Sequence, residues 1–427
     1  MGESVLTTGF NQVDGTLSCE GVRLEAIARE VGTPAYVYSA GAIRAQYARL
    51  SEALDPHPHR IHYSVKANSN TAILALLRDL GAGVDIVSGG ELFRVIRAGF
   101  TGNDIVFSGV GKTDDELCEA LAARVLLINV ESQGELERLA AIAKQMQVVA
   151  PVALRVNPEV SVETPHPYTR TGERGHKFGI PFDDTLAVAR LALGLPSIKL
   201  VGLDMHIGSQ ISGVDAYENG IRRLLDLLAQ TRAAGARDIR YIDIGGGLAV
   251  AYDDEAPADA KAFADAVLAH VAPTGLELIL EPGRFVVGNA GVLLTRVVDR
   301  KRNGGRDCII ADAGMTDLLR PSHYNAYHRI EAVRPRGIRG VFDIVGPVCE
   351  SGDFFALGRE MEDVLPGELL AIHSSGAYGF VMASTYNSRP RIPEVLVDGD
   401  RVAVVSARER YEDLVRQEPL EPVWRVI

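Results

Sequence analysis

The chain has 427 residues, 47% of them hydrophobic, which is enough for a large core and about two or three domains. Its formal charge of −12, from 44 basic and 56 acidic side chains, argues against a nucleic-acid-binding surface. The N-terminus resembles no secretory leader, and no run reaches the roughly 18 apolar residues of a membrane-spanning helix. Four well-separated cysteines without a C-x-x-C pair indicate neither a zinc ribbon nor a disulfide framework. We therefore expect a soluble cytoplasmic protein with no nucleic-acid or membrane partner.

Short β-rich runs alternate with amphipathic helical stretches from residue 60 to about residue 282. This order is typical of a parallel sheet with crossover helices. The predicted strands are 60–66, 84–88, 105–108, 126–131, 152–156, 200–207, 239–244 and 276–281. The predicted helices include 40–54, before the first strand, and 71–80, 114–122, 134–146 and 217–234 after it. Eight such strands predict a closed (β/α)8 barrel of the TIM type.

Helical periodicity largely stops after residue 291, and short strand-like runs separated by turn signals follow. These runs are 292–298, 308–311, 342–345, 369–372, 391–397 and 401–405. They predict a C-terminal, mostly antiparallel β-sandwich or β-barrel domain. We expect the barrel to span 36–285, and the β domain to combine 1–35 with 286–427.

Reactive side chains collect where the predicted barrel strands end, which is where barrel enzymes place their active sites. Six of the eight strands show this pattern, and the residues are Lys66, Asp85 and Ser88, Arg155 and Asn157, His206 and Ser209, Gly245 to Gly247, and Glu281 to Arg284. The sequence therefore predicts an active site at this end of the barrel. The loop 159–180 is longer than a routine connection, and we expect it to cover that site.

Lys66 lies at the predicted end of the first strand, in the segment YSVKAN. Two interpretations are open, because the lysine is either solvated and without chemical role or held there for amine chemistry. Desolvation lowers the pKa of a lysine, which favours the neutral nucleophile that forms a Schiff base.

The other strand ends allow similar pairs of interpretations. Gly245 to Gly247 form either a tight turn or a loop that approaches a phosphate, and barrels commonly bind phosphate near strands seven and eight. His206 has no second ligand at metal spacing, so it is either a core histidine or a ring that stacks on a flat cofactor. Glu281 and Arg284 are either a surface ion pair or, because Pro and Gly separate them, two side chains aimed at the barrel mouth.

A lysine, a glycine-rich loop, an aromatic face and a carboxylate together describe a pyridoxal-phosphate site. The chain resembles the fold-type III pyridoxal-phosphate-dependent decarboxylases, which have the alanine-racemase-like fold, through essentially its whole length. The matching stretches are YSVKAN (63–68), SGGEL (88–92), ALRVNP (153–158), HKFGI (176–180), HIGSQ (206–210), DIGGG (243–247), EPGR (281–284), LRPSHYNAYH (319–328), CESGD (349–353) and GAYGF (376–380). The implied cofactor is pyridoxal 5′-phosphate.

The resemblance assigns cofactor-binding roles to ten residues, which are Lys66, Asp85, His206, Ser209, Gly246, Gly247, Glu281, Gly283, Arg284 and Tyr378. It makes Lys66 the catalytic Schiff-base lysine and places His206 on the ring face. Ser209, the two glycines, the backbone near Arg284, and Tyr378 would hold the phosphate. Glu281 would keep the pyridine nitrogen protonated, whereas a racemase of this fold type uses an arginine there. This residue therefore favours decarboxylation over racemisation.

Cys349 precedes Glu350 in the β domain. One interpretation is a buried structural thiol. The resemblance instead implies that Cys349 donates a proton to the carbanion after CO2 leaves. In this family the Cys-Glu segment reaches the active site of a second subunit, so a homodimer with composite sites is implied.

The substrate-binding residues favour meso-2,6-diaminopimelate, whose far end carries both a carboxylate and an ammonium. Arg284, Arg320, Tyr324 and Tyr378 are candidates at the substrate, with Glu350 for the distal ammonium. Arg320 and Tyr324 lie four residues apart, a spacing that presents both from one turn. The expected reaction releases CO2 and L-lysine, the last step of bacterial lysine biosynthesis.

Two alternatives stay open: a decarboxylase for ornithine or arginine, and a non-catalytic homologue that only carries the cofactor. A carrier would need no proton donor such as Cys349.

Overall fold

The computed structural model describes residues 9–162, 164–166, 168, 171–172, 175–253 and 255–425. Its contacts divide the chain into two compact units. The first contains residues 40–290 and the short segment 376–381, and the second contains 9–39, 291–375 and the chain from 382 onward. The candidate cofactor residues, Tyr378 included, therefore all belong to the first unit.

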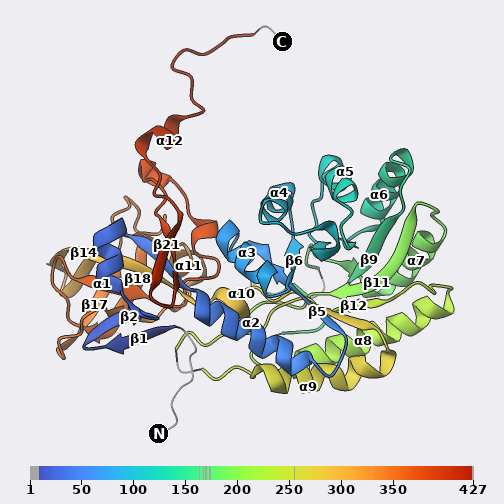
Figure 1. The fold of residues 1–427 in the computed structure, drawn as a ribbon, viewed down its shortest axis with the longest axis horizontal. Coiled ribbons are helices and arrows are strands. Elements are labelled where there is room, and N and C mark those ends of the chain that lie inside the picture. The colour runs from blue at the N-terminus through green and yellow to red at the C-terminus, as the bar shows by residue number, and fades with distance from the viewer. Residues whose placement is uncertain are drawn as a thin grey trace. The chain divides into compact units, whose positions relative to one another are not determined.

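The first unit is a closed barrel of eight parallel strands, as predicted, with helices around it (Figure 1). Hydrogen bonds between β13 and β5 and between β8 and β9 close the ring, and the short strand β10 (Ile180–Pro181) pairs in parallel with the end of β9. The barrel strands are β5 (His59–Ser64), β6 (Gly83–Ile86), β7 (Ile105–Phe107), β8 (Leu127–Val130), β9 (Ala150–Asn157), β11 (Ile198–Met205), β12 (Tyr241–Asp243) and β13 (Glu277–Leu280). The predicted fold class is confirmed.

All eight predicted barrel strand ends differ from the observed ends by one or two residues, and two of these corrections concern Lys66 and Ser88. Strand β5 ends at Ser64, and Lys66 lies in the following 3-10 turn, η1 (Val65–Ala67). Strand β6 ends at Ile86, and the Ser88 side chain caps the next helix by accepting a hydrogen bond from the Glu91 N–H. In both places a turn or cap replaces the last predicted strand residue, so the reactive side chains project from loops above the barrel.

Polar N-cap residues precede most of the helices that follow the barrel strands. Asn70, Ser88, Thr113 and Ser132 each accept a backbone N–H in the first turn of the helix that follows. The helices are α2 (Ala40–Leu54), α3 (Thr71–Asp79), α4 (Gly89–Arg97), α5 (Asp114–Ala123), α6 (Gln133–Gln145), α7 (Phe182–Leu193), α8 (Asp215–Ala233), α9 (Ala260–Val271) and the short α10 (Arg284–Val287). Each cap fixes where a strand-to-helix loop ends, and these loops form the mouth of the barrel.

A buried apolar cluster is drawn from six different barrel strands or their flanks. Its members are Val106, Leu127, Ala153, Val201, Tyr241 and Ile279, with Leu126 packed against them. Burial of this cluster is the hydrophobic contribution that holds the closed sheet together. Polar groups are therefore expected to gather at the strand ends.

The second unit is rich in strands, as predicted. Its main sheet has the order β18-β17-β15-β14-β4-β20-β21, with β19 joining β14 and β16. Most pairs are antiparallel, but β15–β17 and β4–β20 are parallel. The elements are β1 (Phe10–Val13), β2 (Thr16–Cys19), β3 (Val22–Arg23), α1 (Leu24–Val31), β4 (Ala35–Ser39), β14 (Gly291–Asn303), β15 (Arg306–Ala311), α11 (Arg320–Tyr324), β16 (Ile330–Ala332), β17 (Arg339–Val345), β18 (Phe354–Glu362), β19 (Leu369–Ile372), β20 (Glu394–Asp398), β21 (Arg401–Ser406) and α12 (Tyr411–Val415).

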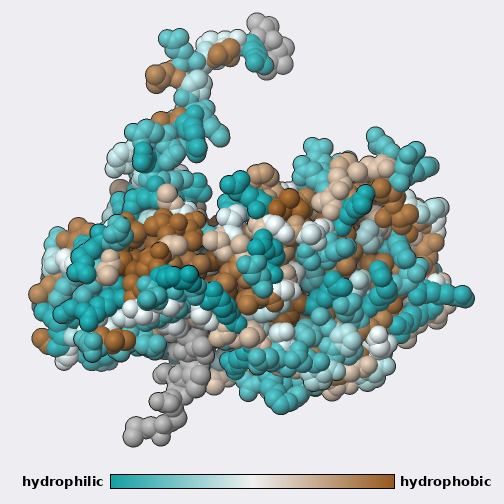
Figure 2. Space-filling model, viewed as in Figure 1, coloured by the Kyte–Doolittle hydropathy of each residue, from teal (hydrophilic) through white to brown (hydrophobic). Residues whose placement is uncertain are grey.

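The surface of the second unit is not uniformly polar. Figure 2 shows a hydrophobic area over β21, where Val402 and Val404 are 42% and 53% exposed. They lie two residues apart, so they project from one face of an edge strand. Such a face is suited to contact with another protein surface. Among the described residues, no helix is long and apolar enough to cross a membrane.

Candidate active site

Lys66 forms an ion pair with Asp85 at the mouth of the barrel. Its Nζ lies 2.7 Å from Asp85 Oδ2, and the same carboxylate oxygen accepts a hydrogen bond from Ser64 Oγ at 2.8 Å. The Asp85 side chain is fully buried, whereas that of Lys66 is 35% exposed. Ser64 lies opposite Asp85 in the register of β5 and β6, which explains how one buried carboxylate reaches both groups. The ammonium is therefore fixed at one side and accessible at the other.

The prediction that desolvation leaves Lys66 neutral is wrong for this structure. Burial does lower the pKa of the ammonium, but the charges of Asp85 and Glu281 outweigh it and raise the pKa above its ordinary value. The lysine is therefore charged in the protein described here. Asp85 is the nearest group from which its protonation state is controlled.

Glu281 follows β13 and lies among polar groups of neighbouring strands. Its Oε1 accepts hydrogen bonds from Ser108 Oγ at 3.2 Å and from Asn129 Nδ2 at 3.3 Å. Burial, followed by the charge of Asp85, raises the pKa of this carboxyl to about 7. A carboxyl with this pKa is poised to exchange a proton near neutral pH.

His206 follows β11 and packs against the triple glycine that follows β12. The Gly246 N–H donates to His206 Nδ1 at 3.1 Å, so this ring nitrogen is an acceptor. Burial, and then the charges of Arg155 and Lys66, lower the pKa of His206 well below its ordinary value. The His206 ring is therefore a neutral imidazole, and a backbone hydrogen bond orients it. This arrangement suits stacking against a flat cofactor ring.

The glycine loop leaves no room for side chains. A Cβ on Gly246 would lie 2.1 Å from the Glu281 carbonyl oxygen, and one on Gly247 would lie 2.4 Å from the Gly208 carbonyl oxygen. Gly245 and Gly247 also have φ values of +67° and +108°. The N–H groups of Gly245 and Gly246 already donate to Asp243 Oδ1 and His206 Nδ1. The loop is thus both a tight turn and a close backbone approach between two strand ends.

Replacing Gly246 by alanine is expected to weaken binding of pyridoxal 5′-phosphate by about 10²-fold, because the loop must move to accommodate the methyl group. Titration of the cofactor-free protein with the cofactor, followed by absorbance, measures this. Gly134→Ala is the matched control, since no heavy atom lies within 4 Å of its Cβ position. Equal affinities for both variants would show that the loop does not contact the cofactor.

Arg284 connects the loops after β11 and β13. Its Nη2 donates to Ser209 Oγ at 3.2 Å, its Nη1 donates to the Tyr252 hydroxyl, and its guanidinium lies 4.8 Å from the centre of the Tyr378 ring. The Tyr378 N–H donates to the Ala67 carbonyl at 2.8 Å, next to Lys66. The structure therefore brings Ser209, Arg284 and Tyr378 together, and a cation with hydroxyl donors suits an anionic group.

Gly283 allows the turn before Arg284 to pack closely. A Cβ there would lie 2.9 Å from the Ala67 Cβ and 3.0 Å from the Ser64 Cβ. The Ser64 N–H also donates to the Pro282 carbonyl at 3.1 Å. This packing keeps the loop that carries Glu281 and Arg284 against the loop that carries Lys66.

The remaining predicted residues belong to the β-rich unit. Arg320 and Tyr324 are the first and last residues of α11, and the guanidinium lies 5.7 Å from the tyrosine ring centre. Cys349 is a free, exposed cysteine, so the interpretation as a buried structural thiol is wrong. Glu350 beside it is also exposed, and the Cys349 N–H donates to Asn387 Oδ1 at 2.8 Å. This segment presents a thiol and a carboxylate at the surface.

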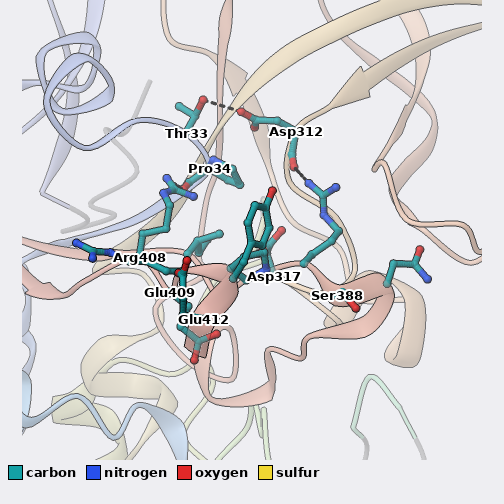
Figure 3. A pocket seen from close by; sticks show the side chains of 14 residues that line it. Thr33, Pro34, Asp312, Asp317, Ser388, Arg408, Glu409 and Glu412 are labelled. Carbon is teal, nitrogen blue, oxygen red and sulfur yellow. Dashed lines mark hydrogen bonds between the residues drawn. The ribbon is translucent and has the colours of Figure 1, made fainter. Parts of the chain in front are cut away.

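A cavity of about 650 Å³ in the β-rich unit contains none of the predicted site residues (Figure 3). Arg389 donates to the Asp312 carbonyl, and Thr33 donates to the Asp312 carboxylate, across this cavity. Arg408 donates to the Pro34 carbonyl at 2.8 Å. The charged groups that line this cavity therefore serve mainly to connect segments of the β-rich unit.

Several buried polar residues of the barrel were not predicted as site residues. They are Ser64, Ser108, Asn129, Asp204 and Asp243, and they contact the predicted residues or lie beside them. Arg155, noted at a strand end, pairs with Glu131 at 2.7 Å and lies 3.8 Å from Asp204. The sequence signal that could have found the two aspartates is a polar residue inside an otherwise apolar strand, as in Leu203-Asp204-Met205 and Ile242-Asp243-Ile244. The loop 159–180, which was expected to cover the site, lies partly outside the described residues, at 163, 167, 169–170 and 173–174.

The barrel and its site define the class of protein. A closed parallel barrel with a lysine–aspartate pair, a neutral histidine and a buried glutamate at its mouth is suited to pyridoxal chemistry. The family model described as "Pyridoxal-dependent decarboxylase, pyridoxal binding domain" matches residues 40–288, more than half of the chain. The predicted cofactor, pyridoxal 5′-phosphate, agrees with this match.

Individual relatives narrow the class. A diaminopimelate decarboxylase of Pseudomonas fluorescens is 48% identical over 415 residues, covering 97% of this chain and 99% of the relative. The structure of the Helicobacter pylori enzyme of that name, complexed with L-lysine, matches with a TM-score of 0.90 at 37% identity, covering 93% and 99% of the two chains. The M. jannaschii enzyme with L-lysine matches with a TM-score of 0.93 at 34% identity, covering 98% and 99%. The chain belongs to the diaminopimelate decarboxylase family.

Proposed function

We propose that this protein is a pyridoxal-phosphate-dependent carboxy-lyase that converts meso-2,6-diaminopimelate to L-lysine and CO2. The observation that carries the proposal is the Lys66–Asp85 pair, which lies at the barrel mouth with buried Glu281. Family membership gives the reaction, because the relatives are named for it. When bound, pyridoxal 5′-phosphate supplies the electron sink that accepts the electron pair left by CO2.

The barrel residues fit this cofactor by their chemistry. Lys66 supplies the amine that bonds the cofactor, and Asp85 controls the proton on that amine. The neutral His206 ring offers a flat face. Glu281 is the proton-exchanging group for the ring nitrogen, and its pKa of about 7 matches that task. Ser209, Gly246, Gly247, Gly283, Arg284 and Tyr378 form the proposed anion-binding group for the phosphate.

Cys349 and Glu350 are the proposed proton donor and the proposed partner of the distal ammonium. A thiol donates the proton that must reach the α-carbon after CO2 leaves, and exposure of Cys349 leaves it free to meet another chain. We infer a homodimer in which this segment completes the partner's site. The exposed Val402 and Val404 support such an association. Four free cysteines fit a reducing compartment such as the cytoplasm.

Arg320 and Tyr324 are the proposed partners of the distal carboxylate. Helix α11 presents the guanidinium and the phenol on one turn, and Arg320 is only 7% exposed. A buried guanidinium beside a hydroxyl is the arrangement that a carboxylate recognises. Ornithine and arginine have no distal carboxylate, so they would not make the contacts with Arg320 and Tyr324 and would bind poorly.

The direct test compares CO2 release from meso-diaminopimelate, L-ornithine and L-arginine by purified protein, with and without added cofactor. We expect cofactor-dependent release from diaminopimelate, with L-lysine as the product. A value of kcat/KM at least about 10³-fold lower is expected for the other two substrates. Release from ornithine or arginine alone would contradict the assigned substrate, and no release from any of them would favour a carrier.

A further inference from the structure

Three buried carboxyl groups converge beneath the proposed cofactor site, and the mechanism so far uses only one of them. Oxygens of Asp204, Asp243 and Glu281 all lie within 4.8 Å of one another, and the three residues are 1%, 0% and 5% exposed. They lie at or next to the carboxyl ends of the neighbouring strands β11, β12 and β13. Water scarcely reaches the space that these three acids share.

Strand register explains why the groups meet. Asp204 lies opposite Asp243 between β11 and β12, and Arg155 lies opposite Asp204 between β9 and β11. Residues in register on parallel strands point to the same face, so these side chains form one row inside the barrel. Like charges directly opposite each other in a sheet are destabilising. The row therefore needs a cation or a proton.

The available cations are engaged elsewhere. Arg155 forms its close ion pair, at 2.7 Å, with Glu131, and its contact with Asp204 is 3.8 Å. Lys66 pairs with Asp85. Around the row, the charged and titratable groups that face it are thus Asp85, Glu131, Arg155, Lys66 and the neutral His206. Two cations face five carboxyl groups.

Protein donors are also too few. Four buried acceptor oxygens in this region have no protein donor: Asp85 Oδ1, Asn129 Oδ1, Asp204 Oδ1 and Asp243 Oδ2. Asn129 does not belong to the acid row, yet its amide nitrogen donates to Glu281 Oε1 while its oxygen lacks a donor. Burial, and then the charge of Glu281, raise the pKa of both Asp204 and Asp243 well above the ordinary range. The acid row is therefore short of both cations and donors, and a proton held between Asp204 and Asp243 supplies one of each that is missing.

We propose that Asp204 and Asp243 share one proton and act as positioning residues for Glu281, their remaining negative charge increasing the proton affinity of the cofactor nitrogen that Glu281 contacts. The cofactor contact rests on the proposed function, but the shared proton does not. A single charge behind Glu281 stabilises a protonated ring electrostatically, whereas two would prevent Glu281 from ionising.

The first experiment needs neither substrate nor cofactor. Infrared spectra of cofactor-free protein labelled with ¹³C-aspartate are expected to show a protonated aspartate carboxyl band at pH 8. Asp204→Asn and Asp243→Asn should each keep the band at a shifted frequency, because burial and the neighbouring Glu281 hold the remaining acid protonated, and the doubly substituted protein should lose it. Asp265→Asn, on an exposed residue of α9, should keep it. Absence of the band in the unmodified protein would overturn the proposal, as would its survival in the doubly substituted protein.

The second experiment uses the cofactor-loaded protein. The pH at which the visible absorbance of the bound cofactor reports loss of the ring proton should fall by about one unit or more in either asparagine variant. Circular dichroism and cofactor stoichiometry check that the variants are folded and loaded. An unchanged transition would show that the pair has only a structural role. Stoichiometric binding of Mg²⁺ or Mn²⁺ to cofactor-free protein, abolished by the same substitutions, would also overturn the proposal. Neither experiment depends on which amino acid is decarboxylated.

Discussion

Replacing Lys66 by alanine is expected to lower kcat for CO2 release from meso-diaminopimelate by about 10⁴-fold or more. Lys66 is the amine fixed by Asp85 at the barrel mouth, with one side accessible at 35% exposure. Its loss removes both the bond to the cofactor and the group that moves protons near it. Steady-state assays with saturating cofactor measure the effect.

Two comparisons keep this prediction specific. Lys261→Ala is the control, because Lys261 is an exposed lysine paired with Asp265 on helix α9, and the variant should retain full activity. Lys66→Arg should be as inactive as Lys66→Ala. A guanidinium keeps the charge next to Asp85, but it stays protonated and therefore is not a nucleophile. Substantial turnover by either Lys66 variant would contradict the assigned role.

Replacing Glu281 by glutamine is expected to lower kcat by about 10²-fold or more while the protein still binds cofactor. Glutamine keeps the size of the side chain and an oxygen that can accept from Ser108 and Asn129. It removes the proton-exchanging group, so the electron sink is weakened. A fall in kcat without a comparable rise in KM is the expected signature, because Glu281 is assigned to the ring and not to the substrate.

The same substitution should also change how stability depends on pH in the cofactor-free protein. The folded pKa of Glu281 is raised from 4.5 to about 7, so the folded state holds this proton more tightly than the unfolded state. As pH rises from 4.5 through 7, this carboxyl therefore costs stability, on the order of 3 kcal/mol in total. Glu281→Gln should remove that part of the pH dependence in denaturant unfolding at pH 5 and pH 8. Parallel pH profiles for the two proteins would contradict the raised pKa.

The fold was predictable because its signals are local. Runs such as Leu127–Val130 and Ile198–Met205 are apolar and bounded by turns, and helix α2 begins and ends where its periodicity does. Strands β1 to β4, β10, β16 and β18 were not predicted. The first three are two to four residues long, and β18 carries exposed charged residues along an apolar pattern.

The position of the candidate site at the strand ends was predictable, but the charge states and pairings of its residues were not. Position at a strand end indicated Lys66, His206 and Glu281, but the charge state of Lys66 depends on Asp85, 19 residues away. Sequence patterns give burial and therefore suggested a neutral amine, whereas the ion pair is a property of the folded barrel. Asp204 and Asp243 show the same limit, because only strand register reveals that they face each other.

Reduction of the cofactor-loaded protein with borohydride, followed by peptide mass spectrometry, tests most directly the claim that this barrel holds pyridoxal phosphate on Lys66 for decarboxylation. We predict a reduced cofactor adduct on the peptide that contains Lys66, formed in proportion to the loss of CO2 release. An adduct on another lysine, or full activity after complete reduction, would contradict it.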